Sequence, residues 1–431
     1  MTSAPYESWV AGADQHPDFS PANLPLGIFS HGDTRPRGGV AIGDSILDLG
    51  AALAEGCFDG LAEHAAQAAS GDSLNAFFAL GAPARQALRR QLLALLDAHH
   101  PQCERWQGLA TRLLLPMQEC QMHLPARVGD YTDFYVGIHH ATRVGRLLRP
   151  DTPLLPNYKY VPIAYHGRAS TLCVSGTPIK RPHGQVLAAG SEVPVLGPSQ
   201  RLDYELEMGI WVGPGNAAGM PIDIQHAGGH VAGFCLLNDW SARDLQAWEY
   251  QPLGPFLSKS FATSLSPWVV TAEALAPFRR AQPARADGDP APLAYLYDEH
   301  DQQHGALDIE LEVLLLTAAM REQGRAAQRL ALSNTLHMYW TVAQMITHHS
   351  VNGCKLQPGD LLGTGTLSGP DTEALGSLFE LTAAGTHPLI LTSGESRRFL
   401  EAGDEVILRA RCVAPGQASI GFGECRGRVL D

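Results

Sequence analysis

One apolar run with a polar end constrains the fold of this chain most. Residues 231–237 read VAGFCLL, and Asn238 and Asp239 follow directly. Such a run is typical of a buried strand, and the carboxyl end of a strand is a usual place for a rigidly held functional side chain. We therefore expect the chain to build a site where this strand ends.

A short helix is predicted next, with Ser241 as its N-cap. Polar side chains three and four residues apart then share one helix face, and the chain turns back at Pro252 and Gly254. Each polar group alone also fits a structural role, such as an exposed ion pair of Arg243 with Asp244. Together, the strand, helix and turn offer a dense set of groups to one volume: Asp239, Arg243, Gln246, Tyr250, Lys259 and Thr263.

Two glutamates in the segment LDYELEMG indicate a cation site. Strand alternation puts Glu205 and Glu207 on the same face, where two carboxylates repel each other unless a positive charge lies between them. Asp133 and Asp239 are available to complete an all-oxygen shell suited to Mg²⁺ or Ca²⁺. An edge strand with a solvated acidic face is the alternative interpretation.

Three other segments carry candidate groups. Residues 130–149 hold an unusual density of them, including Tyr135, His139, His140 and Arg149. The glycine-rich segment LQPGDLLGTGTLSGP offers the hydroxyls or amides of Thr366 and Ser368 to a ligand, and it lacks the lysine of a phosphate-binding P-loop. Glu380 follows in SLFELTAAG, which we interpret as a strand. Ser333 is the predicted cap of a long helix that ends near Gly353.

Composition limits the class of partner and the compartment. A net charge of −13 over 431 residues disfavours nucleic acid and anionic membranes, although a local pocket can still bind an anionic substrate. The eight cysteines show no CxxC pair and are expected to be reduced. The first 19 residues lack a basic segment followed by an apolar core, and no run approaches the length of a membrane span. A cytoplasmic protein is expected.

Seven ordered blocks carry a resemblance to a known family. They read DYTDFYVGIHHA, YHGRAS, SGTPIKRP, LDYELEMG, NDWSARDLQAWEY, PLGPFLSKSF and GTLSGP. In these blocks the chain resembles the fumarylacetoacetate hydrolase family, from LPLGIFS near the N-terminus to IGFGECRGRVL at the end. The resemblance implies a mainly β protein with α-helices: an N-terminal SH3-like barrel with helices over residues 1–120, and a catalytic mixed β-roll over 121–431.

The same resemblance implies a function. It predicts a homodimeric, metal-dependent enzyme that takes a small diketo dicarboxylic acid. The enzyme would hydrolyse the carbon–carbon bond of 4-fumarylacetoacetate to fumarate and acetoacetate, in the last step of tyrosine and phenylalanine catabolism. An isomerase or decarboxylase of a catechol-derived oxo-acid, from the same superfamily, is one alternative. A metal-stabilised binding module without catalysis is the other.

Roles for individual residues also follow from the resemblance. His140 matches the catalytic base, oriented by Glu380, and His139 is a second candidate for that base. The groups that support developing charge are Arg243, Gln246 and Lys259. The implied substrate contacts are Tyr135, Arg149, Tyr165, Gln246, Tyr250 and Thr366. The implied Mg²⁺ or Ca²⁺ site comprises Asp133, Glu205, Glu207 and Asp239, with Lys259 and Thr263 around it.

Overall fold

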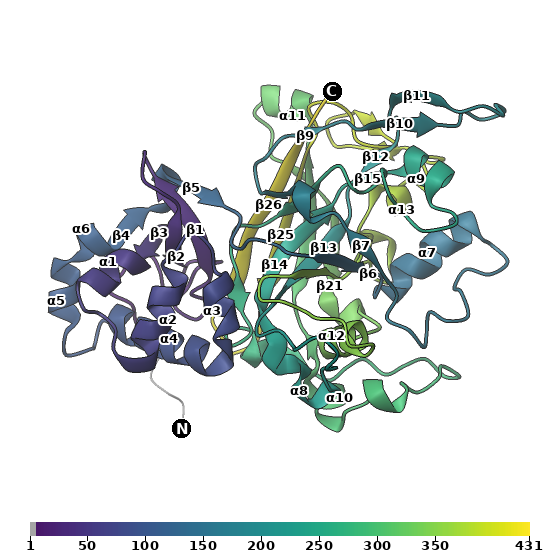
Figure 1. The fold of residues 1–431 in the computed structure, drawn as a ribbon. Helices are drawn as coiled ribbons and strands as arrows, with labels where there is room; N and C mark the ends of the chain where they lie inside the picture. The colour runs from purple at the N-terminus through teal and green to yellow at the C-terminus, as the bar shows by residue number, and fades with distance from the viewer. Residues whose placement is uncertain (1–5) are drawn as a thin grey trace.

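Three larger β-sheets organise the chain, which a computed structural model describes over residues 6–431. Figure 1 shows a smaller N-terminal part, purple to blue, beside a larger part that runs from blue to yellow. Residues 1–5 lie outside the described residues. They are part of the first 19 residues, in which we found no basic segment followed by an apolar core. Every helix within residues 6–431 is too short or too polar to span a bilayer.

The N-terminal part pairs a five-stranded sheet with a layer of helices. The strand order is β4-β3-β2-β1-β5. Gly43, with a positive φ of 55°, turns the chain between β2 and β3, which pair as an antiparallel hairpin. The elements are β1 (Leu26–His31), β2 (Arg37–Ile42), β3 (Ser45–Asp48), β4 (Leu114–Pro116), β5 (Cys120–His123), α1 (Leu49–Ala54), α2 (Gly60–Ala69), α3 (Asn75–Ala79), α4 (Gly81–Leu96), α5 (Cys103–Gly108) and α6 (Ala110–Leu113).

An eight-stranded sheet forms the centre of the molecule, in the order β7-β6-β22-β13-β14-β16-β8, with β17 paired to β14. The predicted apolar strand is β14, and it is buried along its whole length. Its neighbours on either side are β13 and β16. The strands are β6 (Tyr131–Phe134), β7 (Ala164–Gly167), β8 (Leu172–Val174), β13 (Leu206–Val212), β14 (Val231–Asp239), β16 (Thr263–Leu265), β17 (Val270–Thr271) and β22 (Leu361–Gly363).

The third sheet crosses behind the centre, in the order β21-β20-β25-β26-β9, and its long strands β25 and β26 lie side by side in Figure 1. Its strands are β9 (Ile179–Lys180), β20 (Glu310–Leu316), β21 (Gln328–Asn334), β25 (Glu405–Cys412) and β26 (Ile420–Leu430). Short two-stranded ladders are β10 (His183–Val186) with β11 (Val195–Pro198), β12 (Leu202–Asp203) with β15 (Ser241–Ala242), β18 (Arg279–Arg280) with β19 (Ala306–Leu307), and β23 (Leu389–Ile390) with β24 (Ser396–Arg397). The remaining α-helices are α7 (Ile138–Leu148), α8 (Ile224–Ala227), α9 (Arg243–Glu249), α10 (Glu299–His304), α11 (Ala318–Glu322), α12 (Val342–Ser350) and α13 (Leu378–Leu381).

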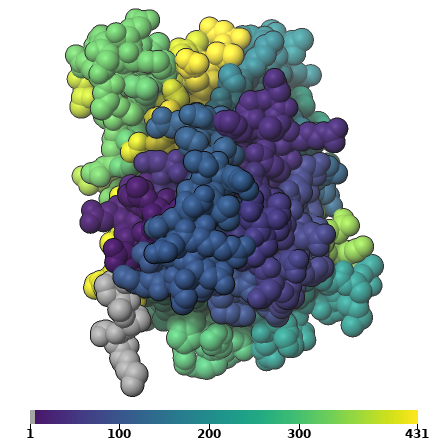
Figure 2. Space-filling model, turned by 90° about the vertical axis from the view of Figure 1, so that its left-hand side faces the viewer, coloured from purple at the N-terminus to yellow at the C-terminus, as the bar shows by residue number. Residues whose placement is uncertain are grey.

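The central sheet has a different hydrophobic core on each face. Because side chains alternate along a strand, Phe234 and Leu236 of β14 pack into the core of the larger part, whereas Leu237 packs into a core shared with the N-terminal helices. Trp211 of β13 reaches that second core, with its ring 6.0 Å from that of Phe78. Figure 2 shows the N-terminal part, purple to blue, covering this side of the molecule.

Local structure differs from prediction at three positions. Ser241 belongs to β15 and pairs with Asp203, so helix α9 begins at Arg243 without a capping side chain. Glu380 lies in helix α13, which begins after its capping residue Ser377. The strand that we predicted for the segment SLFELTAAG is therefore wrong at this position. Ser333 lies in β21, and the helix predicted there begins only at α12, where Thr341 forms a capping box with Gln344.

Candidate active site

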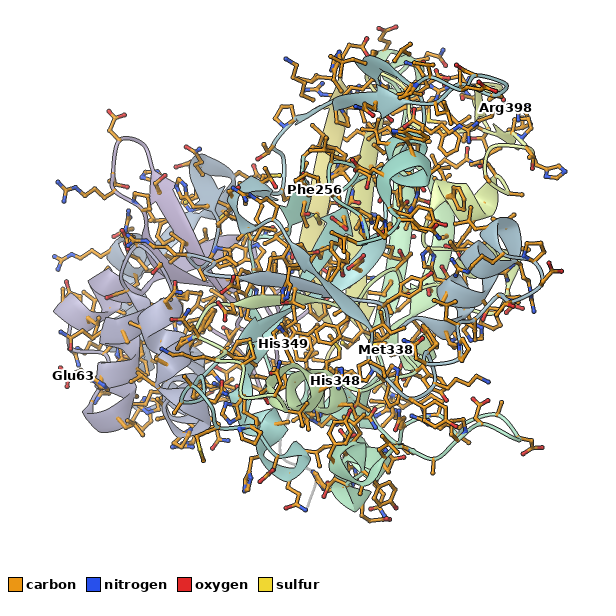
Figure 3. The ribbon with its side chains drawn as sticks, turned by 45° about the vertical axis from the view of Figure 1, so that its right-hand side comes forward. Glu63, Phe256, Met338, His348, His349 and Arg398 are labelled. Atoms are coloured by element: carbon orange, nitrogen blue, oxygen red, sulfur yellow. The ribbon has the colours of Figure 1, made fainter. Side chains whose placement is uncertain are left out.

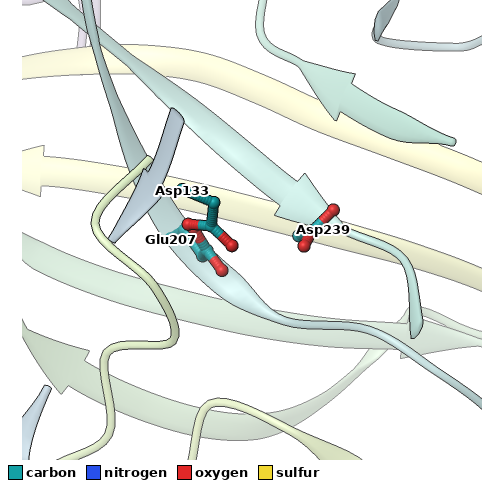
Figure 4. Close-up of side chains that lie close together, drawn as sticks. All are labelled: Asp133, Glu207 and Asp239. Atoms are coloured by element: carbon teal, nitrogen blue, oxygen red, sulfur yellow. The ribbon is translucent and has the colours of Figure 1, made fainter. Parts of the chain in front are cut away.

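Three buried carboxylates from three strands of the central sheet lie close together (Figure 4). We call Asp133, Glu207 and Asp239 the acidic triad. Asp133 lies on β6, Glu207 on β13 and Asp239 at the carboxyl end of β14. One oxygen of each lies within 4.8 Å of the others. The apolar strand β14 therefore ends at Asp239, beside two other buried carboxylates.

Two glycines allow the carboxylates to approach the backbone. The N–H of Gly365 donates to Asp133 Oδ1 at 3.2 Å and to Glu207 Oε2 at 3.0 Å. Its φ is +73°, and a Cβ there would lie 2.2 Å from the carbonyl oxygen of Phe134. At Gly363, a Cβ would lie 2.6 Å from Asp133 Oδ1. The chain can therefore wrap around the triad only with glycine at both positions.

The electrostatics of the triad favour a cation. Burial raises the pKa of Asp133 well above its ordinary value, and the nearby charge of Asp239 raises it further. Burial and the charges of Asp133 and Asp239 do the same to the pKa of Glu207. Glu207 Oε1 is buried and has no hydrogen-bond partner among the described residues. An all-oxygen set of this kind, with an unpaired buried carboxylate oxygen, suits a hard divalent cation.

Glu205 belongs to a different arrangement, although it precedes Glu207 by only two residues. We call Asp203, Glu205, Arg243 and Lys259 the paired group, because each carboxylate in it meets a cation. Arg243 lies 2.8 Å from Glu205 and 2.9 Å from Asp203, and the Lys259 amine donates to Glu205 Oε2. The structure therefore places Glu205 beside the triad and not among its three members.

The paired group is electrostatically satisfied. Burial would raise the pKa of Glu205, but the charges of Lys259 and Arg243 outweigh it, so that pKa is lowered. For Lys259, burial lowers the pKa and the charges of Asp239 and Glu205 overcome that effect, so the net shift is upward. Glu205 and Lys259 are thus held as an ion pair.

Asp239 connects the two groups. Its Oδ2 accepts from Lys259 at 3.0 Å and from the Tyr165 hydroxyl at 2.9 Å, and its Oδ1 accepts from Thr263 at 2.8 Å. Lys259 and Thr263, predicted near the metal, therefore contact a carboxylate of the triad. Their hydrogen bonds fix the orientation of that carboxylate.

A histidine–carboxylate pair lies beside the paired group. His140 Nδ1 is 2.7 Å from Glu380 Oε2, and both side chains are buried. His140 lies on α7 and Glu380 on α13, so the contact joins residues 240 positions apart. His139 instead packs edge-on against His337 at 5.5 Å between ring centroids. The geometry favours His140 over His139 as the base.

The predicted groups open on one cavity of about 410 Å³. All the predicted substrate contacts line it, which brings together side chains from α7, β7, α9 and the loop after β22. Glu207, Asp239, Thr263 and Glu380 lie behind this lining. The polar and charged residues of the wall are Asp133, Tyr135, His140, Arg149, Tyr158, Tyr165, Glu205, Arg243, Gln246, Tyr250, Lys259 and Thr366.

Sequence reasoning missed Asp203, Ser377 and the role of Ser368. Asp203 precedes Glu205 and Glu207 at the same two-residue spacing, a signal that could have identified it. It accepts hydrogen bonds from the backbone N–H groups of Leu378 and Phe379 at 2.8 and 3.0 Å, and so ties α13 to Arg243. Ser368 faces Glu380, whereas we expected it to face a ligand.

Two histidines at the end of α12 have structural partners. His349 Nε2 lies 2.8 Å from Thr132 Oγ1, and His348 Nδ1 lies 2.9 Å from the Tyr295 hydroxyl. Figure 3 labels both side chains, which are partly buried in the larger part. Because each ring has a hydrogen-bond partner, neither is assigned a role in the site.

Comparisons with known proteins cover nearly the whole chain. The family model described as "Fumarylacetoacetase N-terminal" matches residues 22–125, and "Fumarylacetoacetate (FAA) hydrolase C-terminal" matches residues 131–430. The chain is 48% identical to fumarylacetoacetase of Rattus norvegicus and to that of Homo sapiens over 417 residues, with 96% of each chain covered. It is 45% identical to that of Arabidopsis thaliana, with 97% of each chain covered.

One solved structure supports the fold. Fumarylacetoacetate hydrolase from psychrophilic Exiguobacterium antarcticum superposes with a TM-score of 0.50 at 17% identity, over 94% of this chain and 99% of that chain. The likeness agrees with a mixed α/β architecture built on curled sheets.

Proposed function

The chain belongs to the fumarylacetoacetate hydrolase family, and from that premise we propose that it hydrolyses 4-fumarylacetoacetate to fumarate and acetoacetate, as in tyrosine and phenylalanine breakdown. The observation that carries the proposal is a buried His140–Glu380 pair opening on the same cavity as Asp133 of the acidic triad. A binding module needs no base beside a cation site. The site residues and their roles below are part of this proposal.

The proposed cofactor is Mg²⁺ or Ca²⁺, held by Asp133, Glu207 and Asp239. Glu205 is the fourth ligand implied by the family resemblance, and its ion pair with Arg243 sets it apart from the other three. Lys259 and Thr263 serve the metal by orienting Asp239. When bound, the cation supplies Lewis-acid polarisation of a carbonyl oxygen.

His140 acts as the general base. Glu380 accepts at Nδ1, so that nitrogen carries the proton and Nε2 is left with a free lone pair. Nε2 takes a proton from water as its oxygen adds to the carbonyl carbon of the fumaryl group, and Glu380 stabilises the imidazolium that forms. The carbon–carbon bond then breaks, and the departing carbanion takes the proton from the His140 imidazolium, which gives acetoacetate and returns His140 to its neutral form.

The cavity wall binds the charged parts of the substrate. Arg243, Gln246 and Lys259 stabilise the developing oxyanion, a contribution of about 3–4 kcal/mol for each donor in comparable sites. Arg149 binds a terminal carboxylate, and its Nε is buried without a partner within the protein. Hydroxyl groups complete the substrate contacts: Tyr135, Tyr165, Tyr250 and Thr366.

Architecture and assembly are proposed at finer detail as well. We propose two domains, with the five-stranded sheet as an SH3-like barrel and the rest as a β-roll. Pairing of β5 with β1 supports a boundary after His123, slightly beyond the residue-120 boundary expected from the sequence. We also propose a cytoplasmic homodimer. The eight free cysteines support a reducing compartment. Exposed Leu253 and Phe256 offer apolar surface to a second copy, and Phe256 is labelled in Figure 3.

The decisive experiment follows the ultraviolet absorbance of fumarylacetoacetate with the purified protein, before and after a chelator. We expect loss of absorbance with fumarate and acetoacetate as products, abolition by the chelator, and recovery with Mg²⁺ or Ca²⁺. No loss with either cation restored would refute the function and direct attention to isomerase or decarboxylase substrates.

A pair of variants separates the two neighbouring histidines. His140→Ala should abolish turnover while fold and metal binding persist, because the base is lost and the triad is intact. His139→Ala should stay active, since that ring packs against His337. An active His140→Ala protein with an inactive His139→Ala protein would assign the base to the other histidine.

A further inference from the structure

Three hydrogen-bond donors converge on one oxygen of Glu380. Oε2 lies 2.7 Å from His140 Nδ1, 2.8 Å from the Ser368 hydroxyl and 2.9 Å from the Ser377 hydroxyl. The other oxygen, Oε1, is buried and has no partner. Both serines are fully buried. The carboxylate that orients the base therefore shares a single oxygen between the imidazole and two hydroxyls.

The backbone fixes the direction in which each hydroxyl donates. The N–H of Gly376 donates to Ser368 Oγ at 2.9 Å, and the N–H of Glu380 donates to Ser377 Oγ at 3.3 Å. A hydroxyl has one hydrogen to give. Because each serine oxygen already accepts from a backbone N–H, its own hydrogen points to Glu380. Both serines are thus committed donors to a carboxylate.

The remaining surroundings of the pair are charged or titratable. Burial alone would raise the pKa of Glu380, but the charge and hydrogen bond of His140 and the hydrogen bonds of Ser368 and Ser377 lower it overall. The other titratable groups near His140 or Glu380 are Tyr135, His139, Tyr204 and Glu205. Asp203 and Arg243 contact α13 at Leu378 and Phe379, next to Glu380. None of these others donates a hydrogen bond to Glu380 within the described residues.

We propose that Ser368 and Ser377 are positioning residues for catalysis, which hold Glu380 as an anion in the rotamer that meets His140 and limit how strongly it attracts the imidazole proton. The proposal rests on the proposed function, because it assigns the serines to the base of that reaction. A carboxylate that shares its charge with two hydroxyls stabilises the imidazolium less than a bare one would. The serines therefore keep His140 available as a free base.

Removal of either hydroxyl should let the pair hold a proton to higher pH. The proton then resides on His140, beside a more strongly negative carboxylate, or on Glu380, which has lost a stabilising donor. In both cases the base is absent over a wider pH range. The acid limb of the kcat/KM profile should move to higher pH by roughly one unit, as expected when a hydrogen bond to a charged group is lost.

The test measures kcat/KM against pH for the wild type, Ser368→Ala, Ser377→Ala and Ser377→Thr. Ser377→Thr retains the hydroxyl and the N-cap of α13, so it should keep the wild-type profile. Ser350→Ala is the matched control, since the Ser350 hydroxyl is also buried, accepts from the N–H of Ile222 and donates to the Ile346 carbonyl. It should lose stability without any shift of the acid limb.

A second readout does not depend on the substrate. In protein labelled with ¹⁵N-histidine, the imidazole signals missing from His140→Ala identify His140, and their titration is followed by nuclear magnetic resonance. We expect a proton on Nδ1 in the neutral wild type, and imidazolium persisting to higher pH in both alanine variants.

The outcomes separate this proposal from the proposed function. An acid limb and a titration unchanged in both alanine variants would overturn it and leave the serines structural. If the wild type does not act on fumarylacetoacetate, the proposed function fails, and the histidine titration still decides whether the serines tune the pair. If Ser368→Ala does not fold, the comparison of Ser377→Ala with Ser377→Thr decides.

Discussion

The acidic triad and the paired group are neighbours that treat buried carboxylates in opposite ways. In the paired group, Asp203 and Glu205 meet Arg243 and Lys259 within the chain. In the triad, the hydrogen bonds that Asp133 and Glu207 receive from residues 6–431 come from the backbone N–H of Gly365, and one Glu207 oxygen has no partner among those residues. The comparison teaches that a carboxylate retained in the interior without a cation of its own is prepared for one from outside.

The largest expected effect comes from removing the Arg243 guanidinium, which contacts both carboxylates of the paired group. Arg243→Met leaves Asp203 and Glu205 short of a buried partner, and should lower the free energy of unfolding by about 3–5 kcal/mol. Urea unfolding of the metal-free protein measures it. Arg409→Met is the control, because Arg409 pairs with Glu424 at the surface and should cost less than about 1 kcal/mol. Equal costs for the two variants would contradict the distinction between buried and exposed pairs.

Replacement by glutamine should change the stability of the metal-free protein in opposite directions at Glu207 and at Glu205. Glu207→Gln removes repulsion within the triad, so the metal-free protein should gain stability while its affinity for Mg²⁺ or Ca²⁺ falls about tenfold or more. Glu205→Gln leaves Lys259 and Arg243 underpaired, so the metal-free protein should lose stability. Calorimetric titration gives the affinities and urea unfolding the stabilities. Loss of stability in both variants would remove the contrast.

The pH dependence of stability sharpens the comparison. The pKa values of Asp133 and Glu207 are raised above the ordinary 3.8 and 4.5. The folded protein therefore gains stability from holding these protons. That contribution is full below the ordinary values and is lost as pH rises through the raised values of the folded state. The pKa of Glu205 is lowered, so its ionised form stabilises the folded protein above pH 4.5. That contribution is lost only as pH falls below 4.5. The melting temperature of the chelated protein should therefore fall by about 2 °C or more from pH 5 to pH 8.

A divalent cation should abolish that fall, because it neutralises the triad. Melting curves with chelator and with saturating Mg²⁺ at each pH provide the measurement. If the metal-free protein is equally stable from pH 5 to pH 8, Asp133 and Glu207 do not repel each other as inferred.

The smallest expected effect tests a hydrogen bond that orients Asp239, the carboxylate that connects the two groups. Thr263→Val removes the hydroxyl that donates to Asp239 and nearly keeps the shape of the side chain. One hydrogen bond contributes about 1 kcal/mol, so metal affinity should fall about fivefold. Thr263→Ser retains the donor and should bind metal as the wild type does. Equal affinity of the valine and wild-type proteins would show that the Thr263 hydroxyl does not position Asp239.

Local pattern was sufficient to predict the framework of the site. The apolar run of β14 ending at Asp239, and the alternation that separates Glu207 from Leu206 and Met208, depend on strand geometry, which the sequence expresses directly. Family resemblance supplied the His140–Glu380 pair. The cavity then brings these groups together with the predicted arginine and tyrosines.

The division between Glu205 and Glu207 could not be predicted in the same way. Both residues obey the same alternation, and what separates them is the position of Lys259 and Arg243, set by the turn after α9 and by β15. Ser241 was misassigned for a related reason, since its pairing with Asp203 is a contact across the fold and outweighed its preference for a helix cap.

The two-sided central sheet has a consequence for how the chain can be divided. One face of β13 and β14 packs against the N-terminal part, through Trp211, Leu237 and their neighbours. A chain shortened to residues 126–431 would carry every proposed catalytic group and yet expose this apolar face to water. It should aggregate or be degraded, and co-expression of residues 6–125 should rescue it. Loss of the N-terminal part should therefore lower the solubility of the protein although it removes no proposed catalytic group.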